Sequence, residues 1–431
     1  MNTLAFPAPR TPRREKLLLI VLGVMLGLSC VSFIEPSPYE FLFFVLVPVG
    51  LFSGLVLTRT TLAFFFLIFI AVAAQLVALF PYLQHQPVEG SLTPAFYTIS
   101  TVYLSSSALL FALIFSTNAD RRLTVCLRAY GFSCVFAGLW GFASYLDVAG
   151  LAAREPILGR VAGPFKDPNV LGSYCILGVL FFLQRAVLGQ GVWRLLSFGC
   201  FCIVLAGGTF LSFSRGSWGA TIFATLLMGV STYMTTEEIW VRKRIRRAVV
   251  LLAVLGGLGV TAVIATPTLR DTFVDRAKVT QDYDAGEAGR FGNQRRSISM
   301  LLDRPLGFGP FRFPTYFVLQ PHNSYVGAFA DGGWIGGFAF IFMVLCSSVI
   351  ALQLLFRRSP LLRHMQVAGP ALLAFFLQAV QIDIDHWRFV FLILGIVWGI
   401  RSSLERERSA DVRRVRIEPQ HGISRFGESA A

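Results

Sequence analysis

The run LAFFFLIFIAVAAQLVALF (residues 62–80) decides the fold class of this chain. It contains no charged residue, and as a helix it is long enough to cross a hydrocarbon core about 30 Å thick. Comparable runs recur along almost the whole sequence, in which 55% of the residues are hydrophobic and the mean hydropathy is +0.65. This composition excludes a soluble globular protein, because such a surface could not be hydrated. We therefore predict an all-α polytopic membrane protein.

Working outward from this run, we expect about twelve transmembrane helices. The apolar runs lie near residues 17–34, 41–57, 62–80, 94–116, 123–146, 169–185, 194–213, 217–234, 248–266, 333–355, 367–384 and 386–400. Basic residues precede the first run, but no small-residue cleavage site separates it from the second. The first run is therefore predicted to stay in the protein as a helix and not to be removed as a signal peptide.

The distribution of lysine and arginine predicts which ends of the helices face the cytoplasm. Basic residues recur in the N-terminal tail, at Arg59, in 119–122, 185–194, 241–247 and 356–363, and after Arg401. The alternate connections 35–40 and 81–93 contain neither lysine nor arginine. We therefore predict a cytoplasmic tail (1–16), a membrane domain (17–400) and a second cytoplasmic tail (401–431). The mixed charge of the second tail predicts that it is poorly ordered.

Three connections on the predicted outer side are basic as well: residues 147–168, the turn at Arg215 and the connection 267–332. The chain has 38 basic and 24 acidic residues, a formal net charge of +14. Basic residues in the cytoplasmic tails would face anionic lipid headgroups. Guanidinium groups on the outer side instead predict an anionic substrate there, and phosphate suits their bidentate geometry.

The connection 267–332, between the ninth and tenth spans, is the only one large enough to form a structured unit. We predict one large helical periplasmic loop here, with an amphipathic helix within residues 289–309 that Pro305 ends. Its apolar side is predicted to comprise Ile298, Leu301 and Leu302, and its basic side Arg295 and Arg296.

Two further patterns bear on the class of protein. The chain has no repeat at a fixed period, and the middles of the spans carry almost no ionisable residues, which disfavours an ion-coupled transporter. All seven cysteines lie inside predicted spans. A disulfide framework in the outer loop is therefore excluded, and no zinc site is predicted.

The stretch GRVAGPFKDPNVLGSY (159–174) opens the sixth span. Asp167 as N-cap and Pro168 in the first turn describe an ordinary helix start. A helix N-terminus with Arg160 and Lys166 beside it is also a phosphate site. Both interpretations stay open.

Arg215 lies in the short turn LSFSRGSWGA (211–220) between two apolar spans. An arginine at a helix end can simply extend to lipid headgroups. The outer side normally excludes basic residues, however, and the serines at 212, 214 and 217 could orient the guanidinium group.

The last candidates lie around the large outer connection. Arg290 follows a glycine and precedes Arg295 and Arg296, and solvated helix arginines of this kind are commonplace. His322 stands beside Asn323 in an aromatic, glycine-rich stretch. A lone histidine at an interface is usually structural, and Asn323 is also suited to capping the following helix.

Taken together and in order, these pieces resemble the O-antigen ligase family, which includes O-antigen and exopolysaccharide polymerases. The matching motifs are GPFKDPN (163–169), SRG (214–216), GR (289–290) followed by DRPLGFG (303–309), and HNSY leading to DGGWIGG (322–337). The chain departs from the family at Gln294, where similar proteins often carry tryptophan. An acidic residue common before the last glycine motif is present as Asp331.

The resemblance implies an inverting, metal-independent glycosyltransferase of the bacterial inner membrane, without a cofactor. The donor would be a glycan on undecaprenyl diphosphate, and the acceptor a sugar hydroxyl of the lipid A core, at the periplasmic face. Fixed arginines can assist departure of the lipid diphosphate. A ligase is preferred because there is one dominant outer loop. A repeat-unit polymerase is the alternative, and a lipid-linked oligosaccharide flippase is disfavoured because the spans lack interior polar groups.

The resemblance also implies roles for individual residues. Arg215 and Arg290 would hold the diphosphate, and His322 would accept the proton of the acceptor hydroxyl, for which an ordinary histidine pKa near 6.5 is suitable. Further substrate-binding candidates are Arg160, Lys166, Asn169, Arg295, Arg296 and Asn323. The pair Asp383 and Asp385 in DIDHWR (383–388) is a weak metal signal, and we favour a turn cap or a contact to an arginine.

Overall fold

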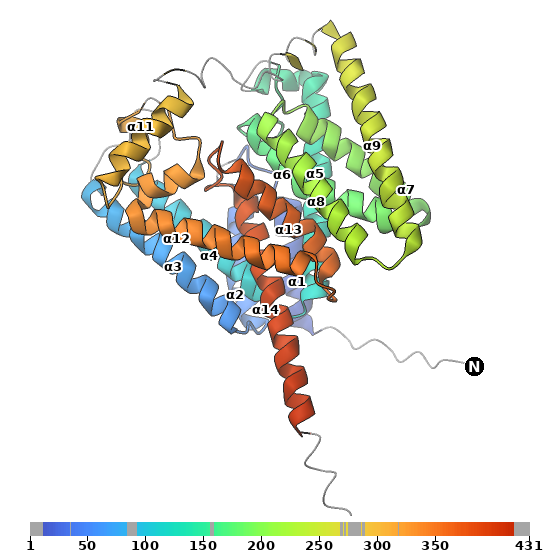
Figure 1. Ribbon diagram of the computed structural model, residues 1–431, viewed down its shortest axis with the longest axis horizontal. Helices are drawn as coiled ribbons and strands as arrows, with labels where there is room; N and C mark the ends of the chain where they lie inside the picture. The colour runs from blue at the N-terminus through green and yellow to red at the C-terminus, as the bar shows by residue number, and fades with distance from the viewer. Residues whose placement is uncertain are drawn as a thin grey trace, which may run out of the picture.

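The computed structural model describes residues 12–417 except 35, 84–92, 156–158, 268–269, 271–272, 275–285, 287–288 and 318. Within this part of the chain the regular elements are all helices (Figure 1). The longer ones are α1 (Arg13–Gly27), α2 (Pro38–Phe52), α3 (Arg59–Leu79), α4 (Pro94–Phe115), α5 (Ala119–Tyr145), α6 (Pro168–Leu188), α7 (Gly191–Ile203), α8 (Arg215–Thr235), α9 (Ile239–Ala265), α11 (Arg290–Leu302), α12 (Ser324–Leu355), α13 (Leu362–Gln378) and α14 (Arg388–Ile417). Short turns of helix are η1 (Phe80–Tyr82), η2 (Val148–Arg154), η3 (Val204–Phe210) and η4 (Phe313–Thr315).

Each predicted apolar run overlaps helical elements, and most bounds shift by a few residues. The largest shifts are the start of α12 at Ser324 and the end of α14 at Ile417. Among the described residues, seven helices are long and apolar enough to cross a membrane: α3 with η1, α4, α5, α6, α7 with η3, α9 and α12. The chain is therefore a multi-pass, all-helical membrane protein. The count of twelve spans stays a prediction.

The centre of the bundle is α6. Its apolar stretch is 89% buried, whereas that of α9, at the edge of the bundle in Figure 1, is only 6% buried. The helices α5, α7, α8 and α13 pack around α6. The two ends of this enclosed helix therefore lie among several neighbours, and each end borders a cavity.

The connections predicted to be cytoplasmic meet at one end of the bundle. Residues from the start of α1, the α4–α5 turn, the α12–α13 turn and α14 line one open cavity there. This shared end agrees with the alternation of basic connections. The assignment of that end to the cytoplasm stays a prediction.

The predicted tail begins within α14, which continues past Arg401 to Ile417, and its poor order stays a prediction. Neighbouring helix ends hold this extension. The carboxylate of Glu405 accepts hydrogen bonds from the amide (3.1 Å) and hydroxyl (2.6 Å) of Thr60, and Arg406 donates to the Ser116 carbonyl (3.0 Å). Residues 418–431 lie outside the described part.

The predicted amphipathic helix is present as α11, and it ends before Pro305 as expected. Its predicted apolar side is wrong, however. Leu301 is buried, but Ile298 and Leu302 are exposed, and the buried face instead contains Asn293 and Ser297. Tertiary contacts select this face: Leu301 packs in a small apolar cluster, which also contains Phe308, Phe313, Phe317, Val326 and Ala330.

The helix α12 is broken at Gly333, which coincides with the predicted start of the tenth span. Gly333 has φ 62° and ψ −161°, and the chain on either side of it is helical. The amide of Trp334 donates to the Pro305 carbonyl (2.9 Å), and its indole N–H donates to the Leu301 carbonyl (2.9 Å). The break thus lets the turn after α11 pack directly against α12.

An alanine at position 333 is expected to lower thermal stability. Its Cβ would lie 2.1 Å from the Pro305 carbonyl oxygen and 2.7 Å from Leu306 Cα, at a φ that favours glycine. We expect a cost of at least about 1–3 kcal/mol. The unfolding temperature in detergent measures it, with Gly229→Ala as control, since a Cβ at that helical position meets nothing within 4 Å. Equal unfolding temperatures for the two variants would contradict this account.

Candidate active site

One cavity of about 370 Å³ collects most of the predicted site residues. It lies where the starts of α6, α8 and α11 meet the α13–α14 loop (379–387). Its lining includes Arg160, Asn169, Arg215, Arg290 and His322. These residues come from four separate segments of the chain, so only the tertiary structure brings them together.

Arg215 is the first residue of α8, and its backbone is set by the residues before it. Ser214 caps α8 by accepting a hydrogen bond from the Ser217 amide (3.3 Å). Phe213 adopts φ 48°, and the π-helical turn η3 precedes it. This places the guanidinium group and the positive end of α8 at the same cavity, an arrangement that favours an anion.

Arg160 joins two of the predicted motifs. It is buried, its Nε donates to the Ser212 carbonyl (3.0 Å), and its Nη2 donates to Asn169 Oδ1 (3.0 Å). The ordinary helix start is confirmed as well, because the Asp167 carboxylate accepts from the Asn169 amide (2.7 Å). The start of α6 is therefore both a capped helix end and a wall of the cavity.

Arg290 opens α11 and reaches across to the α13–α14 loop. Its Nη1 donates to the Gln381 carbonyl (3.3 Å), and its guanidinium carbon lies 4.9 Å from the centre of the Phe291 ring. These contacts hold the start of α11 beside the cavity, so that Arg290 faces it together with Arg215.

His322 is held in an uncommon backbone conformation by Asp383. Its φ is 46°, in the left-handed region. The Asp383 carboxylate accepts hydrogen bonds from the amides of His322 (3.1 Å) and Asn323 (2.9 Å), and its Oδ2 lies 3.6 Å from His322 Nδ1. The imidazole is 41% exposed. It is therefore both anchored at its backbone and accessible from the cavity.

The contact of Asp383 with His322 was not predicted from the sequence. The expected turn cap is present, but it caps the turn at His322, which is 61 residues away in the sequence. Burial and the negative charge of Asp385 raise the pKa of Asp383 to about 8. The Asp-x-Asp spacing favoured a turn cap or an arginine contact over a metal, but it did not identify His322 as the partner.

Behind Asp383 lies a partly buried polar network that joins α4, α12 and the α13–α14 loop. The Tyr97 hydroxyl donates to Asp385 Oδ2 (2.5 Å) and lies 3.0 Å from Asp331 Oδ2, while His386 Nδ1 lies 2.8 Å from Asp385 Oδ2. A hydroxyl has a single hydrogen, and the shorter distance shows Asp385 as its main acceptor.

The charges of this network follow from its contacts. Burial opposes the charge on Asp385 and on His386, but their mutual contact outweighs it, so that the pKa of Asp385 is lowered and that of His386 is raised. The contact between Asp385 and His386 therefore favours the ionised form of both groups. The network fixes the loop that presents Asp383.

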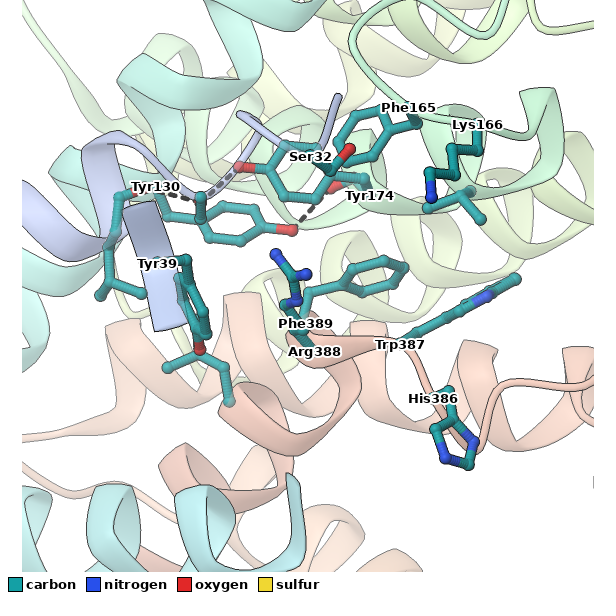
Figure 2. A pocket seen from close by; sticks show the side chains of 14 residues that line it. Ser32, Tyr39, Tyr130, Phe165, Lys166, Tyr174, His386, Trp387, Arg388 and Phe389 are labelled. Atoms are coloured by element: carbon teal, nitrogen blue, oxygen red, sulfur yellow. Dashed lines mark hydrogen bonds between the residues drawn. The ribbon is translucent and has the colours of Figure 1, made fainter. Parts of the chain in front are cut away.

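Lys166 does not line this cavity. It lies at a second pocket of about 180 Å³, which borders the first through Trp387. Figure 2 shows this pocket, whose walls are largely aromatic: Tyr39, Tyr130, Phe165, Tyr174, Trp387 and Phe389. Arg388 is held there by the Ser37 hydroxyl (2.8 Å) and by Glu40.

Three other predicted residues lie outside the first cavity. Arg295 and Arg296 are on the exposed face of α11, and Arg296 donates to Asn293 Oδ1 (2.7 Å). Asn323 caps α12, since its Oδ1 accepts from the amides of Tyr325 (3.0 Å) and Val326 (3.2 Å). The capping interpretation of Asn323 is therefore confirmed.

Gln294, which replaces the tryptophan common in similar proteins, has a contact next to the site. Its Nε2 donates to the Pro321 carbonyl (2.7 Å), directly before His322. Within the described residues, no group of three or more His, Cys, Asp or Glu side chains could hold a metal ion. Metal independence stays a prediction.

Comparison with known families supports the resemblance that the sequence motifs indicated. A family model described as O-antigen ligase matches residues 198–341, which include Arg215, Arg290 and His322. Over this region the resemblance drawn from the motifs is confirmed. Comparison with curated proteins gave no match.

Proposed function

We propose that this chain, whose residues 198–341 match the O-antigen ligase family, transfers a glycan from undecaprenyl diphosphate to an acceptor sugar hydroxyl. One observation carries the proposal: a single cavity collects Arg160, Arg215, Arg290 and His322. In our proposal the cavity faces the periplasm, both termini are cytoplasmic, and the acceptor is the lipid A core.

The arginines suit the leaving group. A lipid diphosphate gains negative charge on its leaving oxygen as the bond to the anomeric carbon breaks. Guanidinium groups stabilise such oxygens through paired charge-assisted hydrogen bonds. Arg215 and Arg290 face the cavity from two different helix starts, and buried Arg160 is held by Ser212 and Asn169. This arrangement is fixed before the reaction, as electrostatic stabilisation of a transition state requires.

His322 suits the role of general base. With Nδ1 toward Asp383, we assign Nε2 as the atom that takes the proton from the acceptor hydroxyl. The acceptor oxygen then forms its bond to the anomeric carbon on the face opposite the diphosphate. The bond between that carbon and the diphosphate oxygen breaks, and the diphosphate leaves with the electron pair. The configuration at the anomeric carbon is inverted.

The aromatic pocket beside Trp387 suits the glycan. Aromatic rings pack against the apolar faces of sugars, and Lys166 and Arg388 add positive charge at its lining. Because this pocket adjoins the first cavity, a sugar next to the diphosphate could extend into it. We therefore retain Lys166 as a contact to the glycan and not to the diphosphate.

Replacing Asp383 by asparagine is expected to lower the transfer rate roughly a hundredfold and to change its pH dependence. Ionised Asp383 stabilises the imidazolium that forms when His322 takes the proton. Because the pKa of Asp383 is about 8, the wild-type rate is expected to rise as the pH increases through that value. Asp383→Asn removes this rise, and a pH–rate profile from pH 6 to 9 measures it.

Thermal stability separates this effect from misfolding. A pKa raised from 3.8 to about 8 means that the contribution of Asp383 to stability is complete below about pH 4 and is lost progressively as the pH rises to about 8. Unfolding temperatures of Asp383→Asn are therefore expected to fall less than those of the wild type between pH 7 and 9. A variant with an unchanged pH–rate profile would exclude Asp383 as the partner of His322.

Reconstitution tests the proposed function. The purified full-length chain is incubated in proteoliposomes with an undecaprenyl-diphosphate-linked glycan and lipid A core, in the presence of EDTA. Transfer of the glycan to the core supports the ligase, and elongation of the lipid-linked glycan without transfer supports the polymerase. Movement of the glycan across the bilayer without a new glycosidic bond would support a flippase and exclude both enzymes.

A further inference from the structure

Another cavity, of about 330 Å³ and with a basic lining, lies at the opposite end of the bundle from the candidate active site. It borders the last turn of α6 and the first turn of α13, whereas the candidate site borders the first turn of α6 and the last residue of α13. It also contacts the starts of α5 and α7. None of its residues belongs to the machinery described above.

Three arginines from three helices converge on this cavity: Arg128 of α5, Arg185 of α6 and Arg363 of α13. Among the described residues, none of the three has a carboxylate within ion-pair distance. The guanidinium carbon of Arg185 lies 5.5 Å from the centre of the Phe181 ring, which fixes its position. Asp120 is the acidic residue in the lining, and its side chain is 77% exposed. The cavity therefore carries net positive charge.

The wall of the cavity is polar and tied to the helices. Gln184 Nε2 donates to the Arg363 carbonyl (2.9 Å), which joins α6 to α13. His364 Nε2 lies 3.2 Å from the Thr124 hydroxyl, and its Nδ1 lies 3.8 Å from Asp120 Oδ1, beyond hydrogen-bond distance. Because this nitrogen makes no hydrogen bond within the described residues, it is suited to contact a polar group bound beside the three arginines.

The mouth of the cavity lies at the edge of the bundle. Trp193 in its lining is 68% exposed, and Val192, Leu195 and Leu196 beside it are exposed as well. Exposed apolar residues on a peripheral helix face lipid, and a tryptophan at a helix end is typical of the membrane interface. These residues favour an opening at the depth of lipid headgroups.

We propose that this cavity binds the phosphate group of an anionic phospholipid headgroup. Guanidinium groups pair bidentately with phosphate oxygens, and basic pockets between membrane helices bind such headgroups. Because the lipid would contact α5, α6 and α13 together, its binding stabilises the packing of these helices. The proposal does not depend on the enzymatic activity of the chain.

The test uses the purified full-length chain in neutral detergent micelles doped with either phosphatidylglycerol or phosphatidylcholine. Phosphatidylglycerol is expected to raise the unfolding temperature, and native mass spectrometry is expected to show it as a retained adduct. The double variant Arg128→Gln, Arg363→Gln is expected to lose roughly tenfold or more in affinity for phosphatidylglycerol. Both arginines are exposed, so the substitutions remove no buried contact.

The variant Arg194→Gln is the matched control. Arg194 is an exposed arginine in the first turn of α7, close to the cavity, but it does not line the cavity. It is expected to bind phosphatidylglycerol as the wild type does. Equal binding by the wild type and the double variant would overturn the proposal. Equal stabilisation by inorganic phosphate at the same concentration would overturn the headgroup assignment and indicate a site for a free anion.

Discussion

Replacing His322 by alanine is expected to lower the rate of glycan transfer by roughly 10²- to 10⁴-fold, the usual contribution of a general base. The physical reason is that the acceptor hydroxyl is a poor nucleophile unless a base accepts its proton. The effect is expected in kcat, with little change in KM for the lipid-linked donor, because His322 does not contact the diphosphate in the proposed mechanism.

Two observations distinguish a missing base from a damaged fold. The unfolding temperature of His322→Ala should stay close to that of the wild type, since the imidazole is 41% exposed and the anchoring bonds to Asp383 come from backbone amides. Added imidazole should restore part of the rate by entering the space that the side chain leaves. Full activity in His322→Ala would exclude the catalytic role.

Replacing Arg215 or Arg290 by alanine is expected to lower kcat by roughly 10²- to 10³-fold each, and to raise KM for the donor. Each guanidinium group faces the same cavity and would bind the diphosphate both before and during departure from the sugar. Lysine at either position should recover part of the loss, because it keeps the charge but cannot form two parallel hydrogen bonds.

Arg295→Ala is the matched control for Arg290→Ala. Both arginines lie on α11, but Arg295 is exposed and does not line the cavity. Its replacement is expected to change the transfer rate less than about threefold, the range of a surface charge at a distance. If Arg295→Ala were as damaging as Arg290→Ala, the diphosphate would have to bind along α11 and not in the cavity.

The predicted helices were recovered because apolar runs of spanning length depend on local sequence alone. The buried face of α11 was not predicted correctly, because the helix pattern placed Ile298 and Leu302 on the buried side. In the structure, Trp334 donates to the Leu301 carbonyl, and Leu301 packs with Phe308 and Phe317. These partners lie on separate segments, so the helix pattern could not reveal which side they cover.

The candidate site also depends partly on local sequence and partly on tertiary contacts. Arg160, Arg215, Arg290 and His322 were selected from the sequence because basic residues on the predicted outer side needed an anionic partner, and because their motifs resembled a known family. Their presence in one cavity agrees with that selection. Lys166 belonged to the same motif as Asn169 but lines the neighbouring aromatic pocket, a difference that the motif itself does not reveal.

The sequence by itself determined that the chain is a membrane-embedded helical protein with an excess of arginine at the helix ends, since hydropathy and charge are properties of single segments. Only the tertiary structure decided that Asp383 holds His322, because that contact joins positions 61 residues apart. The spacing of Asp383 and Asp385 is compatible with a metal site, a turn cap or an ion pair. The fold selects among these by placing the His322 and Asn323 amides at one carboxylate, and Tyr97 and His386 at the other.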